Sequence, residues 1–173
     1  MSKTRVWITL GCCLFVMAVF AWAQAIRKPG LWEMTATMTW QKSPLPPGMI
    51  LPPGMKSPFS GSTNTTMVCL TQAMIDKYGA PVPSTQRDCQ ITNVVLNTSS
   101  MTATMVCTGK MNGTATMESS WASGDTAQGK MHFTGTMQSG PNSMPVEWTV
   151  DSTSVYKGPD CGSVQPLPMP AGK

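Results

Sequence analysis

The fold is decided by residues 100–138, which read SMTATMVCTGKMNGTATMESSWASGDTAQGKMHFTGTMQ. Apolar or small residues alternate here with polar ones at a period of two, which is typical of strands that have one face in a core. The residues assigned to the core face are Met111, Gly113, Ala115, Met117, Trp121, Met131, Phe133, Gly135 and Met137. The stretch therefore predicts three antiparallel strands in a row.

The alternation also constrains the turn between the last two of these strands. Opposite residues in an antiparallel pair point to the same face, so odd positions must meet odd positions. A two-residue turn at Gly124-Asp125 would pair odd with even positions, and we therefore expect an odd-length loop at residues 123–125 or one step later. The expected opposite pairs are Met117 with Met131, Ala115 with Phe133, and Gly113 with Gly135.

The same rule applies to the first two strands of the stretch. An odd-length loop at residues 108–110 keeps their apolar faces on one side of the sheet. The expected opposite pairs are Met105 with Gly113 and Ala103 with Ala115.

Residues 1–23 have the pattern of a cleaved export signal. Lys3 and Arg5 precede an apolar run over residues 6–23, which ends in small residues of the kind that signal peptidases accept. We expect cleavage after residue 23, with residue 25 as the second choice. An uncleaved membrane anchor and lipidation at Cys12 are the alternatives. All of these readings place the remainder outside the cytoplasm, in the periplasm or otherwise exported.

Size and charge exclude some classes of partner. Removal of residues 1–23 from the 173 leaves 150, enough for one domain with one core. Ten lysine and arginine residues then stand against eight acidic ones, a net charge of +2 without runs of like charge. This charge distribution does not indicate nucleic-acid binding. Membrane association is expected only if the leader stays uncleaved or is lipidated.

Further strands are expected at residues 31–40, 62–70, 90–96 and 146–156. The only helical signal covers residues 71–78, where Thr71 can cap the first turn and Gly79 ends the helix. We therefore expect an all-β domain over residues 24–161. Its architecture would be a twisted antiparallel meander sheet of about seven strands that closes into a sandwich or partial barrel, with one short helix.

Two segments lack strand patterns. Residues 43–61 form a Pro/Gly-rich loop, with LPPGM at residues 45–49 and again at 51–55. Loops of this length are either functional, as a lid or docking segment, or mobile excursions. Residues 162–173 form a Pro-rich tail, which we expect only Cys161 to hold in place.

Four cysteines remain after loss of the leader, and an even number in an exported chain indicates disulfides. Three connectivities can be drawn. We favour Cys89–Cys107, because the candidate turn at residues 97–99 lies midway between them, and this leaves Cys69–Cys161. A four-thiolate metal site is the competing reading, and no C-x-x-C spacing supports it in the mature chain.

The sequence shows no catalytic constellation. His132, the single histidine, lies on the polar face of its strand with no carboxylate or thiol partner at short range. Glu33, Glu118 and Glu147 occupy solvent-side strand positions, and no phosphate-binding Gly-rich loop precedes a helix. We therefore expect no enzyme activity, no cofactor and no metal site.

Methionine is unusually frequent, with fourteen residues outside the leader. Most fall on the predicted core face, where methionine is a flexible filler. A methionine-lined interior would also suit an apolar ligand, and thioether clusters can bind Cu(I). The residues expected to line a ligand site are Trp32, Trp40, Met105, Met117, Trp121, Met131, Phe133 and Trp148.

Three functional classes follow. The first is non-catalytic binding of an apolar small molecule or an envelope component. The second is a methionine-rich copper-handling protein, and the third is a structural or interaction module of the cell envelope that binds another envelope protein.

Several short motifs carry a family resemblance when taken in order. They are PGLWE at residues 29–33, CLT at 69–71, the spaced Cys89 and Cys107, and G-x-x-C at 158–161. In this order the chain resembles a family of small exported Gram-negative bacterial proteins that is catalogued only as a domain of unknown function. The resemblance implies a periplasmic or envelope location and a mainly antiparallel β fold. It supplies no activity, cofactor or catalytic residue.

Overall fold

The computed structural model describes residues 27–44, 61–81 and 88–169 of the chain. The expected leader, Cys12 and residues 45–60 of the expected loop lie outside the described residues. The described elements are β1 (Gly30–Lys42), β2 (Ser62–Leu70), α2 (Gln72–Tyr78), β3 (Cys89–Leu96), β4 (Ser100–Thr108), β5 (Met111–Ser123), β6 (Thr126–Ser139) and β7 (Asn142–Gly158).

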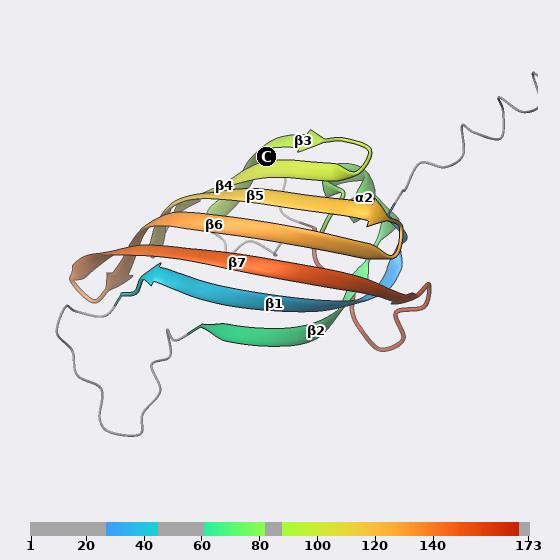
Figure 1. Ribbon diagram of the computed structural model, residues 1–173. Helices are drawn as coiled ribbons and strands as arrows, with labels where there is room; N and C mark the ends of the chain where they lie inside the picture. The colour runs from blue at the N-terminus through green and yellow to red at the C-terminus, as the bar shows by residue number, and fades with distance from the viewer. Residues whose placement is uncertain (1–26, 45–60, 82–87, 170–173) are drawn as a thin grey trace, which may run out of the picture.

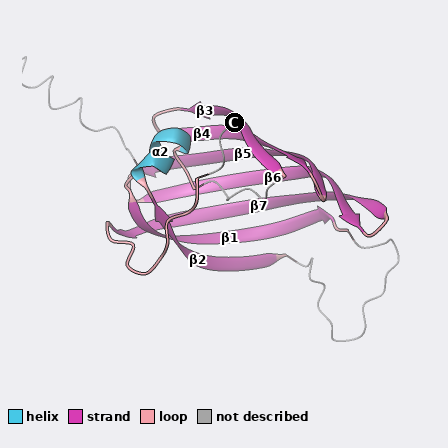
Figure 2. Ribbon diagram, turned by 180° about the vertical axis from the view of Figure 1, so that it is seen from behind, coloured by secondary structure: helices cyan, strands magenta, loops and turns pink. Residues whose placement is uncertain are grey.

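The seven strands form one antiparallel sheet in the order β2-β1-β7-β6-β5-β4-β3 (Figure 1). Strands β3 to β7 follow one another as a meander, and β1 then pairs with β7 on one side and β2 on the other. The sheet is strongly curved and does not close on itself. Seen from behind, α2 lies in front of the strands and covers one end of the face that we call the inner face (Figure 2). The expectation of an all-β antiparallel sheet with one short helix is confirmed, and the open, curved sheet is consistent with the expected sandwich or partial barrel.

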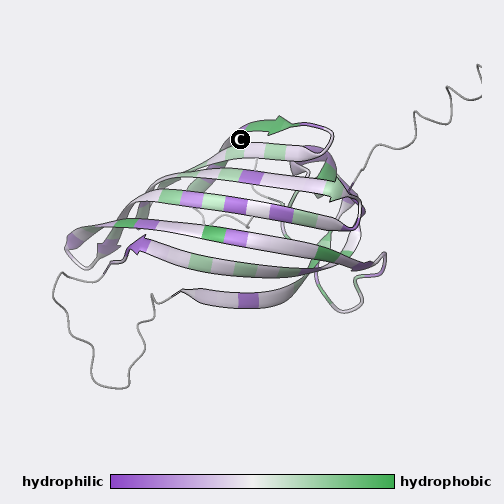
Figure 3. Ribbon diagram, viewed as in Figure 1, coloured by the Kyte–Doolittle hydropathy of each residue, from purple (hydrophilic) through white to green (hydrophobic). Residues whose placement is uncertain are grey.

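The period-two pattern separates the two faces as expected. Hydrophobic and hydrophilic bands alternate along the strands (Figure 3). Phe133 is fully buried and stacks on Trp148 with ring centroids 5.2 Å apart. The predicted core-face methionines are buried or packed against the core, which agrees with their expected role as fillers.

The expected β5–β6 register is confirmed, but its turn differs from the expectation. Met117 lies opposite Met131 and Gly113 opposite Gly135. The strands are nevertheless joined by the two-residue turn Gly124-Asp125 that the parity rule excluded. A bulge between Ser120 and Ser123 places two residues of β5 against one of β6, and this extra residue restores the parity.

The expected β4–β5 register is wrong by two residues. Met105 lies opposite Ala115, and Ala103 lies opposite Met117. A shift of two keeps every side chain on its face, so the alternation cannot distinguish the two registers. The expected register has one large–small pair and one Ala–Ala pair, whereas the observed register has two large–small pairs. The sequence pattern therefore determines the face of each residue but not its partner.

Helix α2 forms where the capping residues predicted it. The Thr71 side chain accepts a hydrogen bond from the Met74 amide at 3.2 Å, and Gly79 ends the helix with a φ of 64°. A β-carbon at Gly79 would lie 2.7 Å from the Trp121 ring, so glycine also permits close packing of this helix end on the sheet. The helix packs Met74, Ile75 and Tyr78 into the core. Within the described ranges, no helix combines the length and the apolar character required to cross a bilayer.

Two disulfides join the pairs that the sequence favoured. Cys89–Cys107 joins opposite residues of β3 and β4, and Cys69–Cys161 joins the end of β2 to the segment after β7. The tail is held by more than Cys161, contrary to the expectation. The Leu167 amide donates a hydrogen bond to the Cys69 carbonyl, and the Leu167 side chain packs against the core.

The two disulfides should differ in their contribution to stability. In the chain-entropy model, the sequence separation of 18 for Cys89–Cys107 corresponds to about 3 kcal/mol, and that of 92 for Cys69–Cys161 to about 4.5 kcal/mol. We expect the Cys69→Ala/Cys161→Ala variant to lose more free energy of unfolding in urea than the Cys89→Ala/Cys107→Ala variant. The reverse order would show that the longer loop is already constrained in the unfolded chain.

The glycine pair Gly113–Gly135 should be intolerant of any side chain. A β-carbon at Gly135 would lie 2.2 Å from the Asn112 carbonyl oxygen and 2.9 Å from the Phe133 ring. We expect Gly135→Ala to lower the free energy of unfolding by about 2–3 kcal/mol, because the backbone must move to admit the methyl group. Gly158→Ala is the matched control, since no heavy atom lies within 4 Å of that β-carbon. Equal stability of the two variants would contradict the close strand packing.

Candidate functional site

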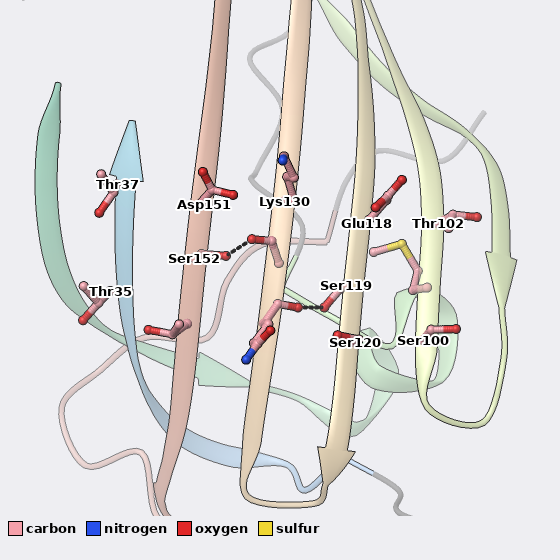
Figure 4. A pocket seen from close by; sticks show the side chains of 14 residues that line it. Thr35, Thr37, Ser100, Thr102, Glu118, Ser119, Ser120, Lys130, Asp151 and Ser152 are labelled. Carbon is pink, nitrogen blue, oxygen red and sulfur yellow. Dashed lines mark hydrogen bonds between the residues drawn. The ribbon is translucent and has the colours of Figure 1, made fainter. Parts of the chain in front are cut away.

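The outer face of the sheet carries a shallow polar trough of about 640 Å³. One cross-strand row runs through it from β1 to β4, formed by Thr37, Asp151, Lys130, Glu118 and Thr102 (Figure 4). All five side chains are exposed. The register places Lys130 between two carboxylates, so the charges of the row largely compensate each other. An exposed surface whose charges compensate each other does not desolvate a ligand. We therefore do not place the candidate binding site in this trough.

The inner face has a more enclosed pocket of about 340 Å³. Its floor is a cross-strand row of small residues, in which Ala36 lies opposite Ser152, Ser152 opposite Gly129, and Gly129 opposite Ser119. The neighbouring rows carry methionine, valine and aromatic side chains. Space remains because four adjacent strands present small residues at the same level, on the same face of the sheet.

The two hydroxyl groups of the floor are already engaged by the sheet. Ser152 Oγ donates to the Gly129 carbonyl at 3.3 Å, and Ser119 Oγ donates to the Gln128 carbonyl at 3.1 Å (Figure 4). Both bonds use the hydroxyl proton within the strands. The floor is therefore less polar than its composition suggests, and it suits contact with carbon atoms.

The walls of the pocket are mainly apolar. Met34, Met101, Met117 and Met131 come from four different strands, and Leu167 reaches the pocket from the tail. Ala80 and Pro81 border the pocket beyond the end of α2. Methionine side chains are unbranched and polarisable, so these walls can adapt to ligands of different shape.

Arg27 introduces a charged group at this apolar pocket. Only 2% of the residue is exposed. Its guanidinium carbon lies 4.4 Å from the centroid of the Trp32 ring, and one terminal nitrogen donates to the Gly79 carbonyl at 3.5 Å. Burial lowers the pKa of Arg27 to about 10, so the group remains positively charged at neutral pH. Its Nε has no hydrogen-bond partner among the described residues.

The structure divides the predicted ligand residues into two groups. Met117 and Met131 line the inner pocket, and Trp32 lies against Arg27 at the pocket. The other five pack in or against the core instead. Trp148 lies opposite Trp40 of β1 and stacks on Phe133. Met105 is buried, and Trp121 donates its ring N–H to the Thr98 carbonyl. The binding role of the eight residues stays a prediction.

Sequence reasoning missed the features that shape the pocket. The floor residues Ala36, Ser119, Gly129 and Ser152 are recognisable only when the cross-strand register is known, because they are far apart in the chain. Arg27 could not be recognised as a pocket residue from the sequence, since it lies outside any segment with a periodic pattern. In the described part of the chain, His, Cys, Asp and Glu side chains form no cluster of three that could hold a metal ion.

Comparison with known proteins identifies the family of the chain. No curated protein and no solved structure matched it. One family model matched residues 27–161, and its description is "Protein of unknown function (DUF3617)". The match starts at the buried Arg27, ends at the disulfide-bonded Cys161, and covers well over half of the chain. The protein therefore belongs to the DUF3617 family, a family of unknown function.

Proposed function

We propose that this protein is an exported, non-catalytic binder of an apolar small molecule, and that the inner pocket is its binding site. The observation that carries the proposal is the row of small residues across four strands, which opens a space of about 340 Å³ between apolar walls. Small-molecule sites of proteins are concave and mostly apolar, with volumes of roughly 300–1,000 Å³. The pocket falls at the lower end of this range.

The lining supports binding rather than catalysis. Among the described residues, Arg27 is the buried charged residue that lines the pocket, and it precedes β1 in the chain. Glu118 and Lys130 also border it, but they occupy outer-face positions on β5 and β6. A buried arginine keeps its proton at neutral pH and does not serve as a general base. The pocket is therefore suited to hold a molecule without transforming it.

Export is the second part of the proposal. Disulfides persist in oxidising compartments such as the bacterial periplasm, and the structure contains two. The leader pattern at residues 1–23 supports the same location. A periplasmic binder of a poorly soluble compound would fit a pocket that shields carbon atoms from water.

Copper handling is the competing candidate, because several methionines border the same pocket. They are Met34, Met67, Met101, Met117 and Met131. Thioethers favour Cu(I). The charged guanidinium of Arg27 at this pocket repels a metal cation, however, and it therefore favours an apolar ligand over copper. A third candidate, docking of an envelope protein, would use exposed surface instead of the pocket.

Filling the pocket should weaken binding without disturbing the fold. The probe is N-phenyl-1-naphthylamine, an apolar dye whose fluorescence rises when it leaves water. We expect Ala36→Leu to weaken dye binding roughly tenfold, a difference of about 1.4 kcal/mol, because the leucine side chain occupies the pocket floor. Thr39→Leu is the matched control, since it adds the same side chain to an exposed outer-face position of β1.

Two results would contradict the proposal. Equal dye affinity in wild type and Ala36→Leu would show that the dye binds elsewhere. Removal of Cu(I) from a bathocuproine chelator by the wild-type protein, lost in Met117→Leu and Met131→Leu, would favour copper handling instead.

A further inference from the structure

The pocket combines apolar walls with a buried positive charge, and this pairing defines a class of ligand. We propose that the ligand is a single-chain anionic amphiphile, a long-chain carboxylate, whose head group binds Arg27 and whose hydrocarbon chain lies along the row of small residues. The inference rests on the proposed function and specifies its ligand.

The first step is the electrostatic state of Arg27. A buried ion is costly to the folded protein unless an opposite charge or several hydrogen bonds compensate it. The ion pairs among the described residues all join other side chains. Asp125, the carboxylate that contacts the neighbouring residue of the chain, is paired with Lys28 at 2.7 Å. Burial alone accounts for the lowered pKa of Arg27, with no carboxylate acting against it.

The second step is the hydrogen-bonding capacity of Arg27. A guanidinium carries five N–H donors in a fixed plane. Among the described residues, one of them reaches the Gly79 carbonyl at a long 3.5 Å, and the buried Nε reaches no acceptor. The Trp32 ring covers one face of the group at 4.4 Å and leaves the donors at its edge. A carboxylate accepts two parallel N–H bonds from this edge, which is the arrangement that arginine favours.

The third step is the rigidity of the chain that carries Arg27. The next residue, Lys28, is held twice: its side chain pairs with Asp125, and its carbonyl accepts the Trp32 ring N–H at 2.9 Å. The Pro29 carbonyl accepts a bond from the Tyr156 hydroxyl at 3.3 Å. These contacts join the segment to β1, β7 and the β5–β6 turn, so the backbone next to Arg27 is held in place. The guanidinium itself is positioned by its contact with the Trp32 ring.

The fourth step is the position of the charge relative to the apolar lining. Arg27 borders the same pocket as Met34, Met131, Val150 and Leu167. A neutral apolar compound would leave the guanidinium buried without compensation. A carboxylate with a hydrocarbon chain compensates the charge and covers the apolar walls at the same time.

The test compares decanoate with decan-1-ol, which has the same chain length and no charge. Affinities are measured by displacement of N-phenyl-1-naphthylamine at pH 8, for wild type, Arg27→Gln, Arg27→Lys and Lys110→Gln. We expect the wild type to bind decanoate at least tenfold more tightly than decan-1-ol. Arg27→Gln should lose this preference and retain its decan-1-ol affinity, and Arg27→Lys should keep part of it. Lys110→Gln should behave as wild type, because Lys110 is exposed in the turn between β4 and β5 and takes no part in holding Arg27.

The outcomes separate this inference from the proposed function. Equal wild-type affinity for the acid and the alcohol would overturn the role of Arg27 and leave apolar binding standing. Displacement of the dye by neither compound would count against the proposed function itself. Loss of folding in Arg27→Gln would not remove the test, because the wild-type preference and Arg27→Lys decide it. Loss of thermal stability in Arg27→Gln with an unchanged preference for decanoate would assign Arg27 a structural role only.

Discussion

Opposite residues in an antiparallel sheet must point to the same face, and this constraint determines where the protein has a core and where it has space. On the inner face, one row pairs Trp40 with Trp148 and Trp148 with Phe133, which fills the space between strands with aromatic carbon. Two rows along, Ala36, Ser152, Gly129 and Ser119 occupy equivalent positions. The same pairing rule brings large side chains together in one row and small side chains together in the other. The pocket therefore results from the register of the strands and not from the absence of a strand or helix.

The pocket lies between two well-packed layers that stabilise its walls. On one side is the aromatic layer of Phe133 and Trp148, and on the other are Trp32, Trp121 and the buried face of α2. The disulfides reinforce different parts of the sheet, one between β3 and β4 and the other at the end of β2. A hollow row can persist in such a sheet because the rows beside it carry the packing.

The sequence predicted those properties that depend on local chemistry or on parity. The cap at Thr71, the end of the helix at Gly79 and the pairing of Cys89 with Cys107 follow from short segments, and the structure has all three. The sequence-based prediction was wrong where two registers or two turn lengths satisfy the same parity rule. A two-residue shift of β4 on β5 preserves the faces, and a bulge beside the turn Gly124-Asp125 compensates an even turn. The pocket floor and Arg27 were not predictable, because they depend on the register of four strands and on a non-periodic segment.

The Cys69–Cys161 disulfide links one wall of the inner pocket to the redox state of its surroundings. The bond brings the tail back along the end of β2, where Pro166 bridges to Cys69 and Leu167 borders the pocket. When this bond is reduced, the tail loses its covalent link to β2. The Leu167–Cys69 hydrogen bond and the packing of Leu167 against the core then hold this wall. The wall that Leu167 contributes to the pocket is therefore less constrained in the reduced chain than in the oxidised one. Formation of the Cys69–Cys161 bond is therefore the step that joins this wall covalently to β2, and an oxidising compartment preserves it.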